Sequence, residues 1–321
     1  MTNFFFQDYA QNITKDDEKL KFELHFDTVQ MPFLKDHFFS GVCLVPAAIM
    51  IDVSVTAFNM WLPNKQLYPL NMREFKVFRA LKIEMGSSSK VTVELKELAS
   101  QLLVKIKMDK LNSAGNVIRR GVTIASVAFN LGNDINETPR VTSKEELNQL
   151  EFEKDNLYGY FIRTHGPLFQ TLQNKMALSS EKTKVLTTFN IKKKENDFGT
   201  KGPSPFACSP LGVDSLLQTA VLFSVVASPG DSECFFTKLP VEIYGLQMKE
   251  PIQMDKNYSI SCSFDDWNDE EMYLTLDYYD QDNKWAGGIN KIVLKTAPFE
   301  KFSRKEVSAT NQVLSQKKKG A

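Results

Sequence analysis

The chain has 321 residues, of which 42% are hydrophobic, so it can bury a sizeable core in one large domain or two medium ones. Lysine and arginine together number 39, as do aspartate and glutamate, and this zero formal net charge argues against nucleic acid or an anionic membrane as partner. The four cysteines form no C-x-x-C pair, so we predict no metal. We recognise no signal peptide and no membrane-spanning apolar run, and expect a cytoplasmic location.

The first half of the chain begins with a strand pattern and then becomes uniformly apolar. Between residues 20 and 26, apolar and polar residues alternate as in a half-buried strand. Residues 46–61 are apolar on nearly every side, which predicts a buried helix with Pro46 in its first turn, where a missing N–H costs little. Further strands are predicted over residues 74–83, 90–98, 102–111 and 117–129, with a hairpin turn at 112–116.

The second half repeats this order. A polar stretch at 131–150 is interpreted as a linker, and the polar tail 303–321 is expected to be disordered. A buried helix followed by antiparallel strands, used twice, predicts an α+β chain with a double hotdog fold: two tandem hotdog folds, each with a buried helix wrapped by an antiparallel sheet. We place the N-terminal hotdog at 1–130 and the C-terminal one at 151–302. The predicted elements of the second half are a strand at 185–191, a helix at 210–226 and strands at 242–248, 258–264, 272–279 and 291–295.

A histidine motif precedes the first helix. His37, Gly41 and Pro46 stand in the pattern His-x3-Gly-x4-Pro. Gly41 has no Cβ, so the backbone here can approach a ligand closely. The segment from Gly41 to Pro46 leads into a helix, and the N-terminal amides of that helix can polarise a carbonyl oxygen as charge builds on it. Taken alone, His37 would more often be a hydrogen-bonded structural residue. The second motif makes a catalytic base the better interpretation.

The second motif lies on the other apolar helix. Asp214 and Gln218 are four residues apart and therefore share a helix face. A carboxylate in apolar surroundings is costly unless it is paired or used. Burial would raise the pKa of Asp214 and favour the protonated form that a general acid needs, with Gln218 holding the carboxyl by a hydrogen bond. An exposed aspartate with a solvated glutamine neighbour fits poorly, because this helix has few other polar residues.

Two further features have weaker interpretations. The string His165-Gly166-Pro167-Leu168-Phe169-Gln170 is, by itself, a turn with an aromatic anchor. Asp52, in the first apolar helix, is unexplained by packing, and we interpret it as an interface or capping residue.

Together the motifs resemble the dehydratase domains of polyketide synthases, over roughly residues 15–300. The family patterns His-x3-Gly-x4-Pro, Asp-x3-Gln (or His) and Tyr-Gly-Pro-x-Phe-Gln all occur in the expected order. His165 stands where tyrosine is usual, so the role of that tyrosine's hydroxyl does not carry over. The matching residues are His37, Gly41, Pro46, Gly166, Pro167, Phe169, Gln170, Asp214 and Gln218.

The resemblance implies removal of water from a β-hydroxyacyl thioester on an acyl carrier protein, giving an α,β-enoyl thioester in polyketide or fatty acid-like biosynthesis. His37 would take the α-proton and Asp214 would protonate the departing β-hydroxyl, with Gln218 orienting the acid. No metal or other cofactor is implied, because the phosphopantetheine arm belongs to the carrier. Oxyanion and substrate contacts would come from Gly41, Val42, Cys43, Pro46, His165, Gly166, Pro167 and Phe169.

Other activities would suit the same histidine–aspartate pair. A double-bond isomerase, a pyran-forming cyclase or a product-template-like cyclase moves protons at the same carbons. A non-catalytic hotdog module that only binds a carrier protein is a further alternative, against which the intact His37 and Asp214 argue. A hotdog thioesterase would need a water-activating carboxylate in place of this pair.

The expected partners are an acyl carrier protein with its β-hydroxyacyl substrate, other polyketide synthase components and a second copy in a homodimer, with no nucleic acid and no membrane. Carrier proteins of this type are acidic, so local positive charge is expected to guide docking. The candidate cations are Arg73, Lys76, Arg79, Arg119, Arg120 and the lysines at 192–194.

Overall fold

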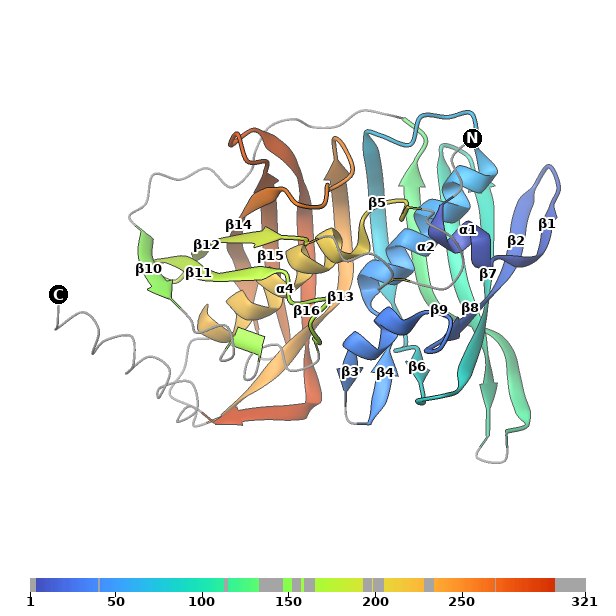
Figure 1. The fold of residues 1–321 in the computed structure, drawn as a ribbon, viewed down its shortest axis with the longest axis horizontal. Helices are drawn as coiled ribbons and strands as arrows, with labels where there is room; N and C mark the ends of the chain where they lie inside the picture. Colours follow the sequence, from blue (N-terminus) through green and yellow to red (C-terminus); the bar gives the residue numbers. More distant parts are fainter. Residues whose placement is uncertain are drawn as a thin grey trace.

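One long antiparallel sheet runs through both halves of the chain, as the computed structural model in Figure 1 shows. Its strands follow the order β1-β2-β7-β8-β9-β5-β13-β16-β15-β14-β12-β11-β10. Strand β5 (Leu70–Val77) of the first half pairs with β13 (Cys234–Met248) of the second half, so the sheet is continuous between them. The structure describes residues 4–39, 41–112, 115–132, 147–151, 157–158, 165–192, 198, 205–227, 234–268 and 270–303.

The other strands of this sheet lie on either side of that central pair. In the first half they are β1 (Gln11–Lys15), β2 (Lys19–Asp27), β7 (Ser88–Leu98), β8 (Gln101–Leu111) and β9 (Val117–Asn130). In the second half they are β10 (Leu147–Glu151), β11 (Leu172–Ser179), β12 (Lys184–Asn190), β14 (Asn257–Trp267), β15 (Glu271–Tyr279) and β16 (Trp285–Ser303). A small second sheet contains β3 (Phe38–Phe39), β4 (Val42–Leu44) and β6 (Lys82–Ile83).

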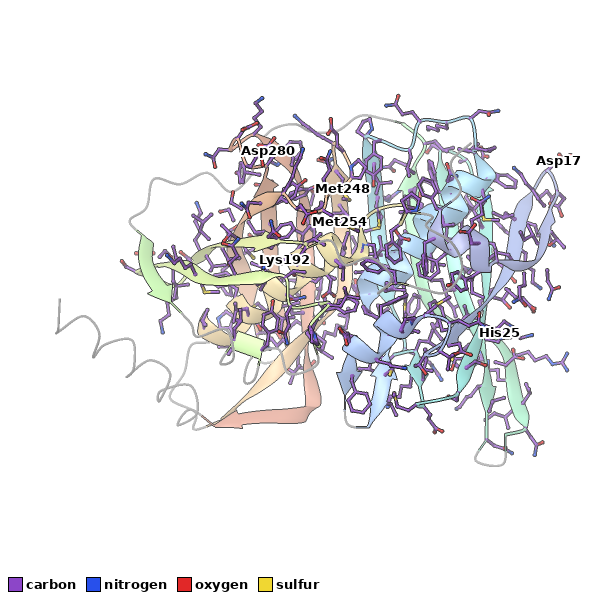
Figure 2. All side chains as sticks on the ribbon, in the orientation of Figure 1. Asp17, His25, Lys192, Met248, Met254 and Asp280 are labelled. Carbon is purple, nitrogen blue, oxygen red and sulfur yellow. The ribbon has the colours of Figure 1, made fainter. Side chains whose placement is uncertain are left out.

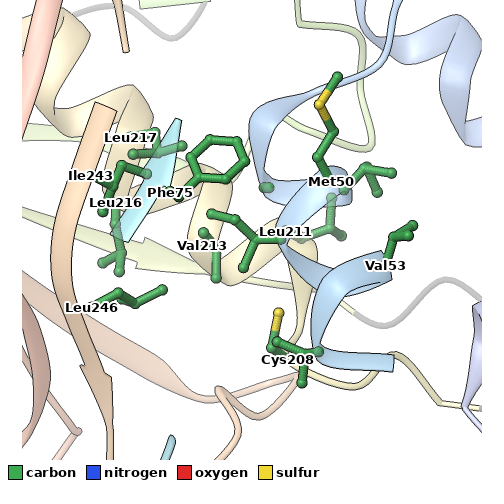
Figure 3. Packing of buried hydrophobic residues seen from close by; sticks show 14 of the residues in the cluster. Met50, Val53, Phe75, Cys208, Leu211, Val213, Leu216, Leu217, Ile243 and Leu246 are labelled. Atoms are coloured by element: carbon green, nitrogen blue, oxygen red, sulfur yellow. The ribbon is translucent and has the colours of Figure 1, made fainter. Parts of the chain in front are cut away.

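Two long helices, α2 (Ala47–Trp61) and α4 (Pro210–Ala227), cover the same face of the sheet, one in each half (Figure 1). Both are apolar on nearly all sides and are buried almost throughout, as expected for helices between a sheet and other elements. The two helices contact each other between the halves, where Met50 of α2 and Leu211 of α4 belong to one apolar cluster (Figure 3). The remaining helices are α1 (Phe5–Tyr9) and the 3-10 helix η1 (Pro32–Asp36).

The small polar residues of α4 do not disturb this burial. Ser215 and Thr219 each donate a hydroxyl hydrogen bond to the carbonyl four residues earlier, at 2.7 and 2.9 Å, and so satisfy themselves within the helix. None of the helices in the described part of the chain is both long enough and apolar enough to cross a membrane.

The predicted helices and most predicted strands are confirmed, with one correction. The single strand expected over residues 74–83 is two strands, because the amides of Phe78 and Arg79 both donate to the Ile124 carbonyl and the chain then leaves the large sheet. Strand β6 pairs with β4 instead. Of the expected linker at 131–150, residues 133–146 lie outside the described part, and its last four residues belong to β10. The expected disordered tail lies outside it too, except for Ser303 at the end of β16.

Asp52 links the two halves. Its Oδ1 accepts a hydrogen bond of 2.6 Å from the Cys208 amide, which lies just before α4. Its Oδ2 is buried and has no hydrogen-bond partner among the described residues. Burial raises the pKa of Asp52 to about 7, and the bond from Cys208 only partly opposes this. The interface role suggested by the sequence is therefore the one observed.

We expect Asp52→Asn to change how stability depends on pH. The native carboxyl keeps its proton up to about pH 7, whereas the unfolded chain releases it near 3.8, so this contribution to stability is lost progressively as pH rises from the lower of these values to the higher. The full difference is about 4 kcal/mol, at roughly 1.4 kcal/mol per pKa unit. Asparagine retains the acceptor for Cys208 and cannot ionise.

Urea unfolding at about pH 5 and about pH 8 measures this effect. The variant should gain stability relative to the wild type as pH rises, and subtraction at each pH cancels the other titrating groups. A difference that is constant across this range would show that Asp52 does not titrate there.

Candidate active site

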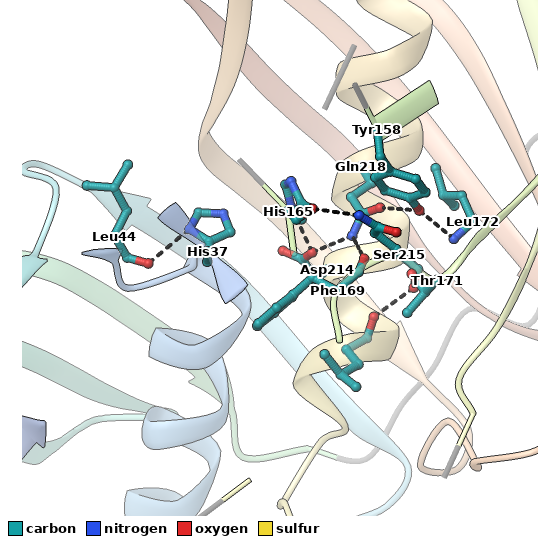
Figure 4. A network of polar contacts seen from close by, with 12 residues as sticks. His37, Leu44, Tyr158, His165, Phe169, Thr171, Leu172, Asp214, Ser215 and Gln218 are labelled. Atoms are coloured by element: carbon teal, nitrogen blue, oxygen red, sulfur yellow. Dashed lines mark hydrogen bonds and ion pairs between the residues drawn. The ribbon is translucent and has the colours of Figure 1, made fainter. Parts of the chain in front are cut away.

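One ring nitrogen of His37 is in a hydrogen bond that orients the ring, and the other can accept a proton. It follows η1, and its Nδ1 donates to the Leu44 carbonyl at 2.9 Å, while the Leu44 amide donates back to the His37 carbonyl at 2.9 Å (Figure 4). This tautomer leaves a lone pair on Nε2. Burial, with a smaller effect of nearby His165, lowers the pKa of His37 to about 4, although Asp214 and the bond to Leu44 act in the opposite direction. His37 is therefore a neutral imidazole at neutral pH, as a proton acceptor must be.

The rest of the first motif builds the turn after His37. Gly41 has a φ of +90°, which favours glycine, and a Cβ there would meet nothing within 4 Å. The turn itself therefore favours glycine, and the close approach of a ligand to this backbone stays a prediction. Val42 and Cys43 lie in β4, with the Cys43 thiol buried and its Sγ 3.6 Å from the Met85 sulfur. Pro46 is the N-cap of α2.

Asp214 lies near the start of α4 with its carboxyl buried. Its Oδ2 accepts two hydrogen bonds, from Gln218 Nε2 at 2.6 Å and from His165 Nε2 at 3.1 Å (Figure 4). Burial raises the pKa of Asp214, but the charge and hydrogen bond of His165, the charge of His37 and the bond from Gln218 together outweigh it, so the net shift is downward. The sequence-based expectation of a raised pKa and a protonated acid is wrong, because it did not include His165.

Gln218 joins Asp214 to a network that sequence reasoning missed in part. Its Nε2 also donates to the Phe169 carbonyl at 2.7 Å, and its Oε1 accepts from the Tyr158 hydroxyl at 3.1 Å. The Tyr158 oxygen in turn accepts the Leu172 amide at 2.8 Å. Tyr158 lies outside every recognised motif and every predicted element, so the sequence offered no signal for it.

The string from His165 to Gln170 lies beside His37. The two histidines form a backbone bridge between the halves, and their rings meet edge to face with centroids 4.8 Å apart. The Phe169 ring is buried against both, with centroids 5.8 Å from His37 and 6.1 Å from His165. Pro167 is exposed. What appeared in the sequence as a turn with an aromatic anchor is therefore the third part of this site.

Asp36 fastens this string to the first half. Its carbonyl accepts the Gly166 amide at 2.6 Å, and its carboxylate accepts the Leu168 amide at 2.7 Å. A Cβ at Gly166 would lie 2.7–2.9 Å from Asp36 atoms, so only glycine fits there.

The side chains of His37, His165 and Asp214 form a possible metal site. One ligand atom each from His37, His165 and Asp214 lie within 4.8 Å of one another. Two imidazoles and a carboxylate are a donor set that zinc accepts. Spacing rules cannot detect this set, because its members lie far apart along the chain.

We expect Gln218→Ala to lower the turnover rate of the site and leave measurable activity. The substitution removes one of two donors to the Asp214 carboxylate and leaves the Tyr158 hydroxyl without its acceptor, but it removes no group that exchanges a proton. The measurement compares the turnover of Gln218→Ala with that of a control variant, Gln170→Ala. The control loses only a side-chain hydrogen bond of 3.0 Å to the His165 carbonyl. A Gln218→Ala protein without detectable turnover would give Gln218 a direct part in the reaction.

Comparison with known proteins places the fold. No family model matches the chain, and no curated protein matches it. Among solved structures, the dehydratase domain from the CurJ module of curacin polyketide synthase superposes with a TM-score of 0.71 at 16% identity, over 90% of this chain and 96% of that one. The dehydratase domain of PpsC from Mycobacterium tuberculosis gives 0.70 at 16%, over 90% and 98%. GphF dehydratase 1 gives 0.63 at 11%, over 90% and 98%.

These matches confirm the resemblance to polyketide synthase dehydratase domains at the level of the fold. The chain is α+β and has the double hotdog fold.

Proposed function

We propose that this protein is a dehydratase that removes water from a β-hydroxyacyl thioester on an acyl carrier protein, giving an α,β-enoyl thioester in polyketide or fatty acid-like biosynthesis. The observation that carries the proposal is a neutral, tautomer-fixed His37 from one half of the chain beside the hydrogen-bonded Asp214 of the other. Removing a proton and a hydroxyl from adjacent carbons needs a base and a source of protons side by side.

Two of the similar structures support this assignment. The PpsC dehydratase domain has been solved in complex with C12:1-CoA, an acyl thioester. A CurJ dehydratase in which a histidine is replaced by phenylalanine is described as an inactive mutant. A bound acyl thioester and a histidine whose replacement gives an inactive protein are what the proposed chemistry predicts for such domains.

In the proposed reaction His37 Nε2 takes the α-proton. Negative charge then develops on the thioester oxygen, and the backbone amides near Val42 and Cys43 are the candidate donors to it. The β-hydroxyl leaves on the side where Asp214 lies and is released as water. Each proton-transfer group of this kind contributes about 10²- to 10⁴-fold.

Incubating the protein with a panel of β-hydroxyacyl thioesters and following product masses tests the proposal. Loss of one water supports it. An unchanged mass with a new chromatographic peak would instead indicate isomerisation or cyclisation, and no product from any carrier-bound substrate would indicate a binding module. One arm contains EDTA, and we expect turnover there to be unchanged, because neither half of the proposed chemistry needs a metal.

The proposed carrier should be steered by charge. Arg73, Arg79, Arg119 and Arg120 are exposed, whereas the Lys76 ammonium is already paired with the Glu74 carboxylate at 2.9 Å. Lys192 is exposed, and the two lysines after it lie outside the described residues. A homodimer and contacts to other polyketide synthase components are further proposed partners.

Added salt should therefore raise KM for a carrier-bound substrate and barely change KM for a small thioester mimic, since surface charges are screened beyond about 10 Å at 0.1 M salt. Steady-state kinetics at several ionic strengths measure both constants. Equal responses of the two substrates would contradict electrostatic docking.

A further inference from the structure

We propose that His37, His165 and Asp214 form a binding site for zinc, and that zinc bound there inhibits the dehydration. The site itself requires no assumption about the reaction, whereas the inhibition rests on the proposed function. Zinc is an inhibitor in this proposal and not a cofactor, because no step of the proposed chemistry uses it. Four observations lead to the site.

The first observation is that three side chains of the kinds that bind zinc converge (Figure 4). One ligand atom from each lies within 4.8 Å of the others, and His165 Nε2 is 3.1 Å from Asp214 Oδ2. Neighbouring ligand atoms of a tetrahedral zinc ion, with bonds of about 2.0–2.2 Å, are about 3.3 Å apart. The widest pair therefore has to close by no more than about 1.5 Å, a shift that rotation of an imidazole can supply.

The second observation is that contacts from outside the cluster orient two of the ligands. His37 Nδ1 is bonded to the Leu44 carbonyl at 2.9 Å, which leaves Nε2 as its ligand atom. The Asp214 carboxylate accepts a hydrogen bond from Gln218 Nε2 at 2.6 Å. Histidines and carboxylates that bind zinc are held by outer hydrogen bonds of these two kinds. Both ligands are therefore positioned before an ion arrives.

The third observation is that an ion can reach the cluster and be retained there. Both imidazoles are partly exposed, whereas the Asp214 carboxyl is buried. Three protein ligands leave the fourth position of a tetrahedral ion to water, as in zinc sites that keep an open position. The Phe169 ring packs against both imidazoles, with centroids 5.8 Å and 6.1 Å away, and this apolar side chain restricts the access of further water.

The fourth observation is that the third ligand is peculiar to this chain among proteins with the resembled motif. His165 stands where that family usually has tyrosine. Tyrosine is not one of the usual zinc ligands, whereas histidine is the commonest metal ligand in proteins. With tyrosine at this position, His37 and Asp214 would be the remaining ligands of the cluster. The histidine therefore turns a pair of ligands into a set of three.

Zinc bound at this site would block the proposed reaction at its first step. The ion occupies the lone pair on His37 Nε2 that takes the α-proton, and it holds Asp214 as a ligand. No bond of the protein is broken, so removal of the ion restores the enzyme. Zinc and a β-hydroxyacyl substrate compete for the same atoms, and we expect the inhibition to weaken as substrate concentration rises.

Isothermal titration calorimetry of the metal-free protein tests the site without any substrate. We expect one zinc ion to bind per chain, and magnesium, which prefers oxygen ligands, not to bind. His165→Tyr should weaken zinc binding by at least about 10²-fold, which is the upper end of what an outer-contact substitution costs. His25→Tyr, on the outer face of β2, makes the same substitution away from the site and should bind zinc as the wild type does. No saturable zinc binding by the wild type, or equal affinity in His165→Tyr, would overturn the inference.

A measurement on the wild-type protein keeps the inference falsifiable if His165→Tyr fails to fold. The chain has three histidines, and the His25 ring signals in NMR can be identified with the His25→Tyr control. One equivalent of zinc should shift the ring signals of the other two histidines and leave those of His25 in place. A response of His25 alone would place the ion on the outer face of β2 and overturn the site.

Turnover of a β-hydroxyacyl thioester tests the inhibition. One equivalent of zinc should stop turnover by the wild type, and EDTA should restore it. Unchanged turnover by a protein with zinc bound would overturn the inhibitory role. A protein that binds zinc through His37 and His165 but dehydrates nothing in its metal-free form would overturn the proposed function and leave the zinc site standing.

Discussion

Replacing His37 with alanine is expected to lower turnover at least 10²- to 10⁴-fold and leave the fold intact. The variant loses the lone pair on Nε2 that accepts the α-proton, and no neighbouring group can substitute, since the other imidazole is engaged with Asp214. The structural cost is small, because among the described residues the ring makes one hydrogen bond, to the Leu44 carbonyl, besides its edge contacts with His165 and Phe169. Single-turnover assays with a carrier-bound substrate, together with circular dichroism, measure both effects.

The matched control for this variant is His25→Ala. His25 lies on the outer face of β2, far from α4 in Figure 2, and its substitution should leave turnover unchanged. The acid limb of kcat/KM in the wild type should also lie well below 6.5, because His37 is neutral down to about pH 4. Near-normal activity in His37→Ala would remove the base from the mechanism.

Much of this fold is predictable because its signals are local. The helices α2 and α4 are long apolar runs with almost no charge, and the outer strands alternate cleanly between polar and apolar residues. The sequence does not predict the strands that form only because another segment of the chain pairs with them. Strand β6 exists because β4 lies beside it, and β10 because β11 does.

In the active site, too, the residues in local motifs could be predicted and those that depend on tertiary contacts could not. His37 and Asp214 can be proposed from their spacing and apolar surroundings, since each motif is short and continuous. The electrostatics could not be predicted, because the decisive neighbour of Asp214 is a histidine 49 residues away in a string that appears to be a turn. An argument from burial alone predicts a raised pKa for the Asp214 carboxyl, whereas its pKa is lowered. Asp36 and Tyr158 were likewise hidden, since both act through contacts between distant segments.

Replacing Asp214 with asparagine is expected to cost as much turnover as losing His37, roughly 10²- to 10⁴-fold. Asparagine has nearly the same shape and still offers an oxygen to Gln218, so the packing of α4 should persist. What disappears is the only ionisable group of α4 in the site, the carboxylate that the His165 ring and the Gln218 amide both contact. Asp52→Asn is the matched control: it makes the same substitution at the buried aspartate of the other long helix and should leave turnover unchanged.

The double variant His37→Ala/Asp214→Asn distinguishes a concerted pair from two independent contributions. Groups that act in one step are strongly non-additive, so the double variant should be little slower than either single one. Independent contributions would instead multiply, giving a loss of about 10⁴-fold or more. Rates of all four proteins on one carrier-bound substrate decide between these outcomes. A multiplicative loss would mean that His37 and Asp214 contribute independently, in separate steps.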